Sequence, residues 1–347
     1  MSHGQDPSKK SGHITMSDVA SGAGVSMKSV SRVINNEPHV SARLRARVEQ
    51  TIATLGYVPD TAARSLAGAR NFVIGVMFDN PSPNYTMKVI SGVYSACTEN
   101  QYHLRFDNVD TTQDDASVSR RLDEIVRLSR CDGFVLTPPL SDHVTLLDLL
   151  DARGIRYSRV APGIDVSRAS AVMMDDHAAG GDVAAFFHRL GHYRIGIVNG
   201  PLLHRAARRR REGFVARMAD LNPDAIIIDT EGDFTFEGGI HAGRDLLAAR
   251  RHPTAIFATN DDMAAGVIAA CHRMGLSVPG DVSICGYDDS WAATSVFPFL
   301  TTIHQPIEAM AHVAATMIID RRPHDVHERL RRLDHQLIER DSTRSLI

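Results

Sequence analysis

The sequence predicts a small all-α unit at the N-terminus, followed by a larger α/β body. Within residues 15–66, helix caps and glycine stops divide the chain into short helices. From Phe72 onward, short apolar runs rich in β-branched residues alternate with helical stretches, as in parallel sheets covered by helices on both faces. These runs are too many for one compact sheet, so we expect two doubly wound subdomains with a cleft between them. A chain of 347 residues has room for such a body and a headpiece.

Two short helices joined by a tight turn are predicted at the start of the all-α unit. Thr15 can cap the first helix, and Asp18 lies where its carboxylate can accept from free backbone amides. Gly24 ends that helix, because glycine readily adopts the positive φ of a sharp turn. Ser26 caps the second helix, whose inward face consists of Val30, Val33 and Ile34.

The outward face of the second helix is polar and cationic. Lys28 can donate to guanine O6 or N7 or to a phosphate, and Arg32 can make a bidentate contact with guanine. Met27 offers apolar contact, for example to a thymine methyl group, and Ser31 completes the face. A short helix with this face fits the major groove of DNA, although many small helical bundles look similar.

A third helix and a further short segment complete the unit. Ser41 caps the third helix, Gly56 ends it, and Pro59 with Asp60 opens a segment that Gly68 closes. The inner face of the third helix consists of Leu44, Val48, Ile52 and Leu55, and its outer face carries Arg43, Arg45 and Arg47.

The charge is distributed unevenly along the chain. Residues 1–70 carry nine Lys and Arg against five Asp and Glu, a net charge of +4, whereas the remainder carries −7. A basic head on an acidic body is expected of a module that contacts DNA, attached to a body that does not.

The N-terminal unit resembles the DNA-binding headpiece and hinge of the lactose-repressor (LacI/GalR) family of bacterial transcription regulators. The matching residues are Asp18–Ala20, Ala23–Ser26, Val30–Val33, Gly56–Pro59 and Ala63–Leu66. The resemblance implies that the residues of the unit that touch DNA phosphates, bases or neighbouring backbone are Thr15, Met16, Ser26, Met27, Lys28, Ser29, Ser31, Arg32, Asn35, His39, Ser41, Ala63 and Leu66. Several of the Ser and Thr residues are also helix caps, and for Ser26 and Ser41 both roles are expected.

The hinge is too short to form a stable helix alone. The resemblance implies that two copies of Ala63–Leu66 pair across a dimer and that Leu66 enters the central minor-groove step and kinks the DNA. The alternative is a plain linker whose leucine faces a core.

Strands and helices alternate through the body. Predicted strands lie at Phe72–Phe78, Gly133–Leu136, Ile195–Val198, Ala225–Ile228, Ala255–Ala258 and Val282–Cys285, and helices near Met87–Glu99, Val118–Leu128, Asp182–Leu190, Ala206–Met218, Ile240–Ala249 and Met263–Met274. The body resembles the same family, and the periplasmic sugar-binding proteins that share its fold, through Gly75-Val76, Leu190–Ile195, Thr259–Ala264, Pro279–Ser283, Gly286–Asp289, Leu300–Ile303 and Gln305-Pro306.

The resemblance implies that the chain crosses between the two subdomains three times. We expect an N-subdomain of 71–162 plus 303–320 and a C-subdomain of 163–302 plus 321–341. The predicted domains are a disordered tail at 1–13, a helix-turn-helix domain at 14–59, a hinge helix or linker at 60–70, a periplasmic-binding-protein-like effector-binding and dimerisation domain at 71–341, and a tail at 342–347.

Polar residues at strand ends indicate where a ligand binds, because ligands of such sheets lie beyond the carboxyl ends of the strands. Asp79, Asn260 and Asp288 each follow a predicted strand. The resemblance implies that Asp288, Asn260 and Arg210 bind effector hydroxyls and that Phe234 supplies an aromatic wall for a sugar. Further lining candidates are Tyr85 and Thr137. The alternative for the run Arg208–Arg211 is a solvated helix face.

No motif for catalysis, metal or membrane is present in the sequence. The cysteines form no CxxC pair, Gly191 separates His188 from His192, and no Ser/His/Asp or Cys/His order is supported. Residues 1–13 lack the apolar core of a secretory signal, and no run approaches the ~20 apolar residues of a membrane span. We expect a cytoplasmic protein that is not an enzyme, with no cofactor and no membrane partner.

These observations predict a transcription regulator, in particular a repressor of carbohydrate-utilisation genes. It would bind a palindromic operator in double-stranded DNA as a homodimer, with its affinity switched by a small carbohydrate-like effector. The alternatives are a sugar-binding protein of transport or sensing, which would need a signal peptide and no headpiece, and an α/β enzyme. The expected dimer contacts are helix faces near Val89–Val93 and Cys271–Met274. The nine residues Glu339–Ile347 are too few for a C-terminal coiled coil.

Overall fold

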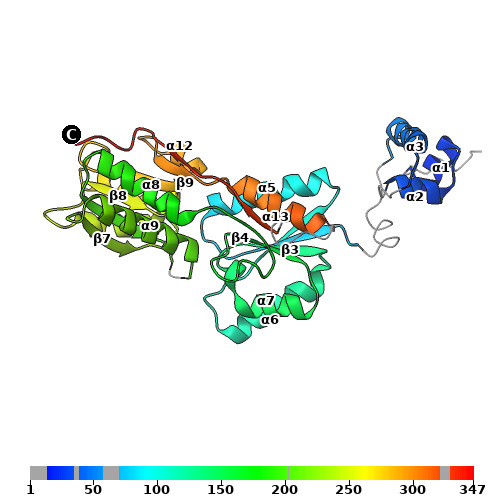
Figure 1. The fold of residues 1–347 in the computed structure, drawn as a ribbon, viewed down its shortest axis with the longest axis horizontal. Helices are drawn as coiled ribbons and strands as arrows, with labels where there is room; N and C mark the ends of the chain where they lie inside the picture. The colour runs from blue at the N-terminus through cyan, green and yellow to red at the C-terminus, as the bar shows by residue number, and fades with distance from the viewer. Residues whose placement is uncertain (1–13, 35–38, 58–69, 202, 321–328) are drawn as a thin grey trace, which may run out of the picture. The chain divides into compact units, whose positions relative to one another are not determined.

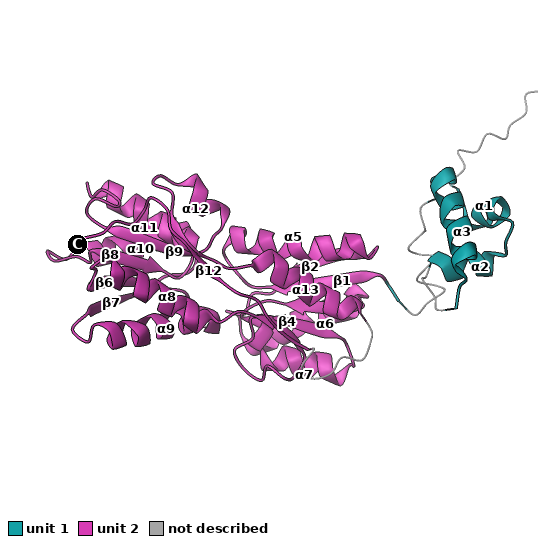
Figure 2. Ribbon diagram, turned by 45° about the horizontal axis from the view of Figure 1, so that its top comes forward, with its two compact units in different colours: residues 1–71 teal, residues 72–347 magenta. Residues whose placement is uncertain are grey.

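The computed structural model of the chain describes residues 14–34, 39–57, 70–201, 203–320 and 329–347. They fall into two units, Met1–Asn71 and Phe72–Ile347, and each unit is described by itself (Figure 2).

The first unit is a three-helix headpiece of α1 (Met16–Ala23), α2 (Met27–Ile34) and α3 (Ala42–Leu55). Thr15 and Asp18 form the predicted capping box, in which the Thr15 amide donates to the Asp18 carboxylate at 2.8 Å. Gly24 ends α1 with a φ of 59°. The helices enclose a small core in which Val19, Val30 and Val48 are completely buried.

Two sheets form the body, and each has six strands among the described residues (Figure 1). The N-subdomain sheet has the order β11-β5-β4-β3-β1-β2 and the C-subdomain sheet the order β12-β10-β9-β8-β6-β7. All neighbouring strands are parallel except β10 and β12. The strands are β1 (Val73–Phe78), β2 (His103–Asn108), β3 (Gly133–Leu136), β4 (Tyr157–Val160), β5 (Ser170–Met173), β6 (Arg194–Asn199), β7 (Ile226–Glu231), β8 (Ala255–Ala258), β9 (Ser283–Asp288), β10 (Thr301–His304), β11 (Leu330–Arg332) and β12 (Gln336–Ile338).

Helices cover both faces of each sheet. The helices of the N-subdomain are α5 (Pro83–Glu99), α6 (Asp115–Ser129), α7 (Val144–Ala152) and α13 (Ile307–Ile319), and those of the C-subdomain are α8 (Asp176–Arg189), α9 (Arg205–Leu221), α10 (Phe236–Leu247), α11 (Asp261–Arg273) and α12 (Trp291–Ser295). On β3, Val135 packs toward α5 and α13, whereas Phe134 and Leu136 pack toward α6 and α7. Such doubly buried strands explain the continuous apolar runs in the sequence.

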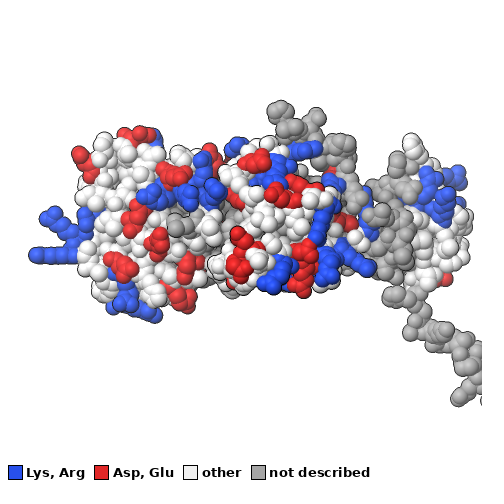
Figure 3. Space-filling model, turned by 90° about the horizontal axis from the view of Figure 1, so that it is seen from below, with Lys and Arg blue, Asp and Glu red and all other residues white. Residues whose placement is uncertain are grey.

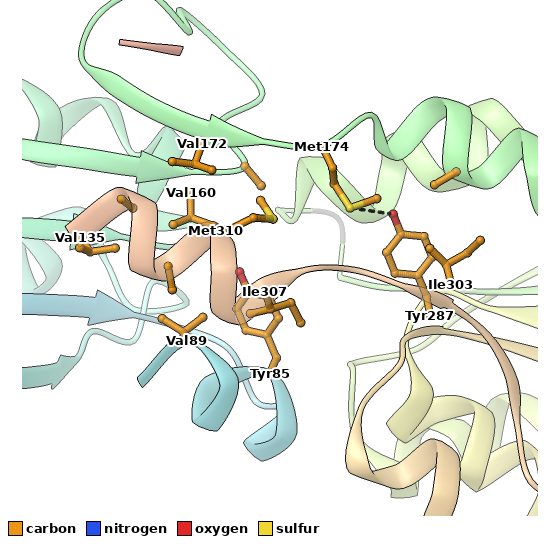
Figure 4. Close-up of a cluster of buried hydrophobic side chains, with 14 of the residues drawn as sticks. Tyr85, Val89, Val135, Val160, Val172, Met174, Tyr287, Ile303, Ile307 and Met310 are labelled. Carbon is orange, nitrogen blue, oxygen red and sulfur yellow. Dashed lines mark hydrogen bonds between the residues drawn. The ribbon is translucent and has the colours of Figure 1, made fainter. Parts of the chain in front are cut away.

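One buried cluster continues from one subdomain into the other. Figure 4 shows it running from Val135 and Val172 in the N-subdomain sheet to Ile303 and Tyr287 in the C-subdomain. The Tyr287 hydroxyl lies 4.0 Å from the sulfur of Met174, just beyond β5. Apolar packing therefore joins the two subdomains where the chain passes from one sheet to the other.

The predicted subdomain boundaries are wrong at each crossing. Strand β5 pairs with β4, so the chain stays in the N-subdomain beyond residue 162 and crosses only after Met173. Strand β10 belongs to the C-subdomain sheet, which moves the second crossing from residue 302 to beyond His304. Within 321–341, which was assigned to the C-subdomain, β11 pairs with β5 and only β12 joins the C-subdomain sheet. These strands are three or four residues long, so they leave little periodic signal in the sequence.

Residues 342–347 were predicted to be a tail. In the structure they pack on the C-subdomain instead. Ser342 is completely buried, and its carbonyl accepts from the Ile284 amide at 2.8 Å. The Leu346 amide donates to the Leu190 carbonyl, also at 2.8 Å. The terminal residues therefore form backbone hydrogen bonds with β9 and with the residue that ends α8.

The helix surfaces expected to form a dimer are only partly buried within the chain itself. Val89, Val93 and Cys271 belong to the cores of their own subdomains, whereas Ser91 and His272–Met274 in the same two segments are exposed. The exposed apolar residues of the same helices are Met87 and Tyr94 on α5, with Met274 at the end of α11.

Candidate DNA interface and effector cleft

The outward face of α2 carries the residues predicted to contact bases. Met27 is 56% exposed and Lys28 is also exposed, while Val30 and Val33 anchor the opposite side of the helix in the headpiece core. Arg32 is half-buried at the end of the same helix. Figure 3 shows basic side chains gathered on the headpiece, whereas both signs of charge are interspersed over the body.

The hydroxyls predicted to meet phosphates also hold the helix ends. Ser26 accepts from the Ser29 amide at 3.2 Å, and Ser41 accepts from the Leu44 amide at 3.3 Å. Thr15 and Ser41 are exposed, as is His39, which has a φ of 67°. Met16, in contrast, packs partly against the headpiece core. Three candidates, Asn35, Ala63 and Leu66, lie outside the described residues.

A polar cleft lies between the two sheets of the body, at the carboxyl ends of their strands, as expected for this kind of fold. Its volume is about 20 Å³, and residues of both subdomains line it. The lining consists of Asn80, Ser82, Tyr85, Pro138, Ala161, His204, Ala206, Ala207, Arg210, Phe234, Asn260, Asp288 and Gln305. Five of the seven predicted effector residues are in this set.

Arg210 is the central cation of the cleft. Its guanidinium is almost fully buried and donates to the Asp176 carboxylate at 2.9 Å, the Thr259 carbonyl at 2.6 Å and the Gln305 side chain at 3.2 Å. It also lies 3.7 Å from the centre of the Tyr287 ring, which favours a cation. The alternative of a solvated helix face is therefore wrong for Arg210, although its neighbours Arg208 and Arg209 are exposed.

Asp288 is a buried carboxyl of the cleft with an unpaired oxygen among the described residues. It is 4% exposed, and among the described residues its Oδ1 atom has no hydrogen-bond partner, with the nearest Arg210 nitrogen at 3.9 Å. Burial raises the pKa of Asp288 well above its usual range, against the opposing effect of Arg210. The residue has a φ of 108°, a strained conformation for a non-glycine residue, and such strain is concentrated at functional sites.

Aromatic side chains form the apolar walls. Phe234 meets the His204 ring edge-on, with 4.9 Å between the ring centres. Burial lowers the pKa of His204 to about 4, so this imidazole is neutral at pH 7. Tyr85 is buried as well, and burial raises the pKa of its hydroxyl. Asn260 caps α11 through its oxygen and donates to the Phe234 carbonyl at 3.1 Å, so it also holds this wall in place.

Two predicted effector residues turn away from the cleft. The Asp79 carboxylate accepts from the Thr111 amide at 2.9 Å, and its neighbour Asn80 lines the cleft instead. Thr137 is completely buried and its hydroxyl donates to the Met77 carbonyl at 3.3 Å, while Pro138 takes the lining position. In both cases the turn that ends the strand, rather than the strand itself, determines which residue lines the cleft.

Several of the lining residues were not predicted from the sequence. For two of them, Gln305 and His204, the position beside a strand or helix end was a signal that could have been used. Gln305 directly follows β10, so the strand-end argument would have found it had residues 301–304 been taken as a strand. His204 immediately precedes α9. The remaining missed residues, Asn80, Ser82, Pro138, Ala161, Ala206 and Ala207, carry no distinctive pattern.

Comparisons with known proteins agree with this architecture. Residues 15–60 match the bacterial regulatory proteins of the lacI family, and residues 184–343 match a periplasmic binding protein-like domain. The ribose operon repressor of Escherichia coli (strain K12) is 36% identical over 316 residues, which cover 88% of this chain and 92% of that protein. The transcriptional repressor PurR of Proteus mirabilis is 34% identical, over 88% of this chain and 90% of that protein.

A solved structure extends the likeness to nearly the whole chain. The lac repressor dimer bound to operator and the anti-inducer ONPF has a TM-score of 0.73 at 25% identity, covering 96% of this chain and 99% of that one. Among the described residues, no helix is long and apolar enough to cross a membrane. On this identity and coverage, the chain belongs to the lacI family of bacterial regulatory proteins and is a DNA-binding transcription regulator rather than an enzyme.

Proposed function

We propose that this chain is a cytoplasmic repressor that binds a two-fold symmetric operator as a homodimer, under the control of a small carbohydrate-like effector in the cleft. The names of its relatives support this proposal, since they include a ribose operon repressor and a lac repressor dimer bound to operator. A lacI-family regulator from Enterococcus faecium with bound ribose has a similar fold, with a TM-score of 0.68.

The unpartnered Oδ1 atom of Asp288 is the observation that carries the effector proposal. A buried polar atom without a hydrogen bond is costly, so it is expected to gain a partner from a ligand. A sugar hydroxyl can donate to Asp288 while it accepts from Arg210, and a neighbouring hydroxyl can reach Gln305. The rings of Phe234 and Tyr85 then face the C–H surface of the sugar.

Calorimetric titration of the full-length protein against a panel of mono- and disaccharides, including ribose and cellobiose, tests this proposal. Asp288→Asn keeps the shape of the side chain but changes what its polar atoms can accept, so we expect affinity for the effector to fall at least tenfold while operator binding persists. Asp245→Asn, at an exposed position on α10, is the matched control and should bind normally. Equal affinities in the wild type and Asp288→Asn would contradict the proposed role of the cleft.

The DNA-binding role requires the headpiece residues to act as a pair across a dimer. Each α2 helix offers few base contacts, and a two-fold symmetric site doubles them. Gel-shift titration against a symmetric operator and a half-site tests this requirement. The full site should bind much more tightly, and equal affinity for both would contradict binding as a dimer.

A further inference from the structure

A second cavity lies beside the polar cleft, and arginines from two elements line it. Its volume is about 170 Å³, and its cations are Arg205 and Arg209 on α9 and Arg332 on β11. Ala161 and Ala206 line both the cavity and the cleft, so the two spaces adjoin. Asp176 lines the cavity and also binds Arg210 of the cleft, at 2.9 Å.

Arg205 and Arg209 occupy positions on α9 where a positive charge destabilises the helix. Arg205 is the first residue of the helix, the first turn contains no acidic residue, and Arg209 lies one turn further along the same face. The positive end of the helix dipole disfavours cations there, and like charges four residues apart repel each other. A sequence that breaks such local rules commonly does so at a functional site.

The protein itself neutralises only part of this charge. Asp142 is the carboxylate closest to Arg205, at 3.6 Å, and it already accepts from Arg159 at 2.9 Å. Among the described residues, neither Arg209 nor Arg332 forms an ion pair within 4.0 Å, although the charge of Arg209 helps to lower the pKa of Asp175.

Asp175 and Asp176 also line the cavity, and their negative charges offset part of the charge of its arginines. The Asp175 carboxylate caps α8 through the amides of His177 and Ala178, and these bonds lower its pKa, so it carries a full negative charge. Asp176 is compensated by Arg210. The cavity therefore keeps an excess of positive charge, because three arginines face only Asp175 and a share of Asp142, which also binds Arg159.

We infer that the effector carries an anionic group, either a phosphate ester or a carboxylate, which binds among Arg205, Arg209 and Arg332 while its hydroxyls occupy the polar cleft. This inference rests on the proposed function. The cavity adjoins the cleft and has a volume of about 170 Å³, so it can hold the anionic group of a ligand whose hydroxyls reach the cleft. Arginine suits this task because its planar group binds both phosphate and carboxylate in a bidentate manner.

Calorimetric titration with matched ligands tests the inference on the full-length protein. The neutral members are ribose and glucose, the phosphate esters are ribose 5-phosphate and glucose 6-phosphate, and the carboxylate is glucuronate. We expect an anionic sugar to bind at least about tenfold more tightly than its neutral counterpart. The two classes of anion separate the phosphate ester from the carboxylate.

The double variant Arg205→Gln/Arg209→Gln should bring the ratio of anionic to neutral affinity close to one. The control Arg217→Gln/Arg244→Gln removes two exposed arginines from outside the cavity and should keep the wild-type ratio. Without ligand, the first variant should melt at the same temperature as the wild type or higher, because it relieves the repulsion at the start of α9. This measurement shows that any loss of binding is not a loss of folding.

Each outcome decides between the two proposals. A neutral sugar that binds as tightly as its anionic counterpart, with an affinity that depends on Asp288, would overturn the anion site and leave the proposed function standing. An unchanged ratio in Arg205→Gln/Arg209→Gln would overturn it as well. Failure of every member of both series to bind would contradict the carbohydrate-like effector and the anion site together.

Discussion

A polar bridge between the subdomains stands beside the effector cleft, and its removal should weaken effector binding. The Asp262 carboxylate, at the start of α11, accepts from the Asn84 amide at 2.6 Å and from the Ser82 hydroxyl, both at the start of α5. Ser82 also lines the cleft. Nearby, the Lys88 ammonium donates to the Asp289 carbonyl at 2.7 Å. Since these bonds join α5 to the C-subdomain, they stabilise the arrangement of the two subdomains around the cleft that the structure shows, which is called the closed arrangement below.

Asp262→Ala removes both bonds to α5. Hydrogen bonds to a charged acceptor each contribute about 1.5–3 kcal/mol, but burial raises the pKa of Asp262, which indicates that desolvation offsets part of the gain. We therefore take about 1.5–3 kcal/mol for the pair. If the effector binds the closed arrangement, its affinity should fall by about 10- to 100-fold.

Calorimetric titration with the best ligand of the sugar panel measures this loss. Asn84→Ala removes one of the two donors and should give a smaller loss, and the combined variant should lose less than the sum of the two, since both changes break the same bond. Asp245→Ala, at an exposed position, should bind normally. Wild-type affinity in Asp262→Ala would refute the reasoning that the bridge stabilises the effector-bound state.

Three further predictions concern pH, base recognition and assembly. Burial raises the pKa of Asp261 to about 7, so between about pH 4 and pH 7 the folded chain keeps a proton that the unfolded chain releases. The resulting contribution to the free energy of unfolding is at most about 4 kcal/mol. It is fully present below about pH 4 and is lost as the pH rises through 7. Urea unfolding between pH 5 and pH 8 should show this decline in the wild type and a flatter profile in Asp261→Asn, and parallel profiles would contradict it. Lys28→Ala or Arg32→Ala should relax base preference at one operator position, by about 1–3 kcal/mol, in binding assays with single-base operator variants; uniform loss on all sequences would instead indicate phosphate contacts. Light scattering should give a homodimer of two 38.0 kDa chains, and a chain that begins at residue 71 should bind effector but not operator; a strict monomer, or operator binding by the shortened chain, would contradict the paired headpieces.

Local signals were sufficient for the headpiece and for the long strands of the body. Thr15, Gly24 and Gly56 act within a few residues of the helix ends that they define, so their effect can be read without knowing the rest of the chain. The buried strands β1 and β6 are continuous apolar runs, because helices cover both of their faces. The family resemblance of these segments agrees with the comparisons.

Only the tertiary structure decided which strand-end residues line the cleft and where the chain crosses between subdomains. Asp79 and Asn80 are adjacent in sequence, yet the first binds Thr111 and the second lines the cleft, because the turn after β1 orients each side chain differently. Arg210 was distinguished from its neighbours by α9 packing against Asp176 and Tyr287. The sequence by itself therefore determined the headpiece helices and many of the buried strands and helices of the body, since these depend on local caps and periodicity. The crossings and the exact lining depend on contacts between segments more than 100 residues apart, such as β5 with β11, which no local pattern records.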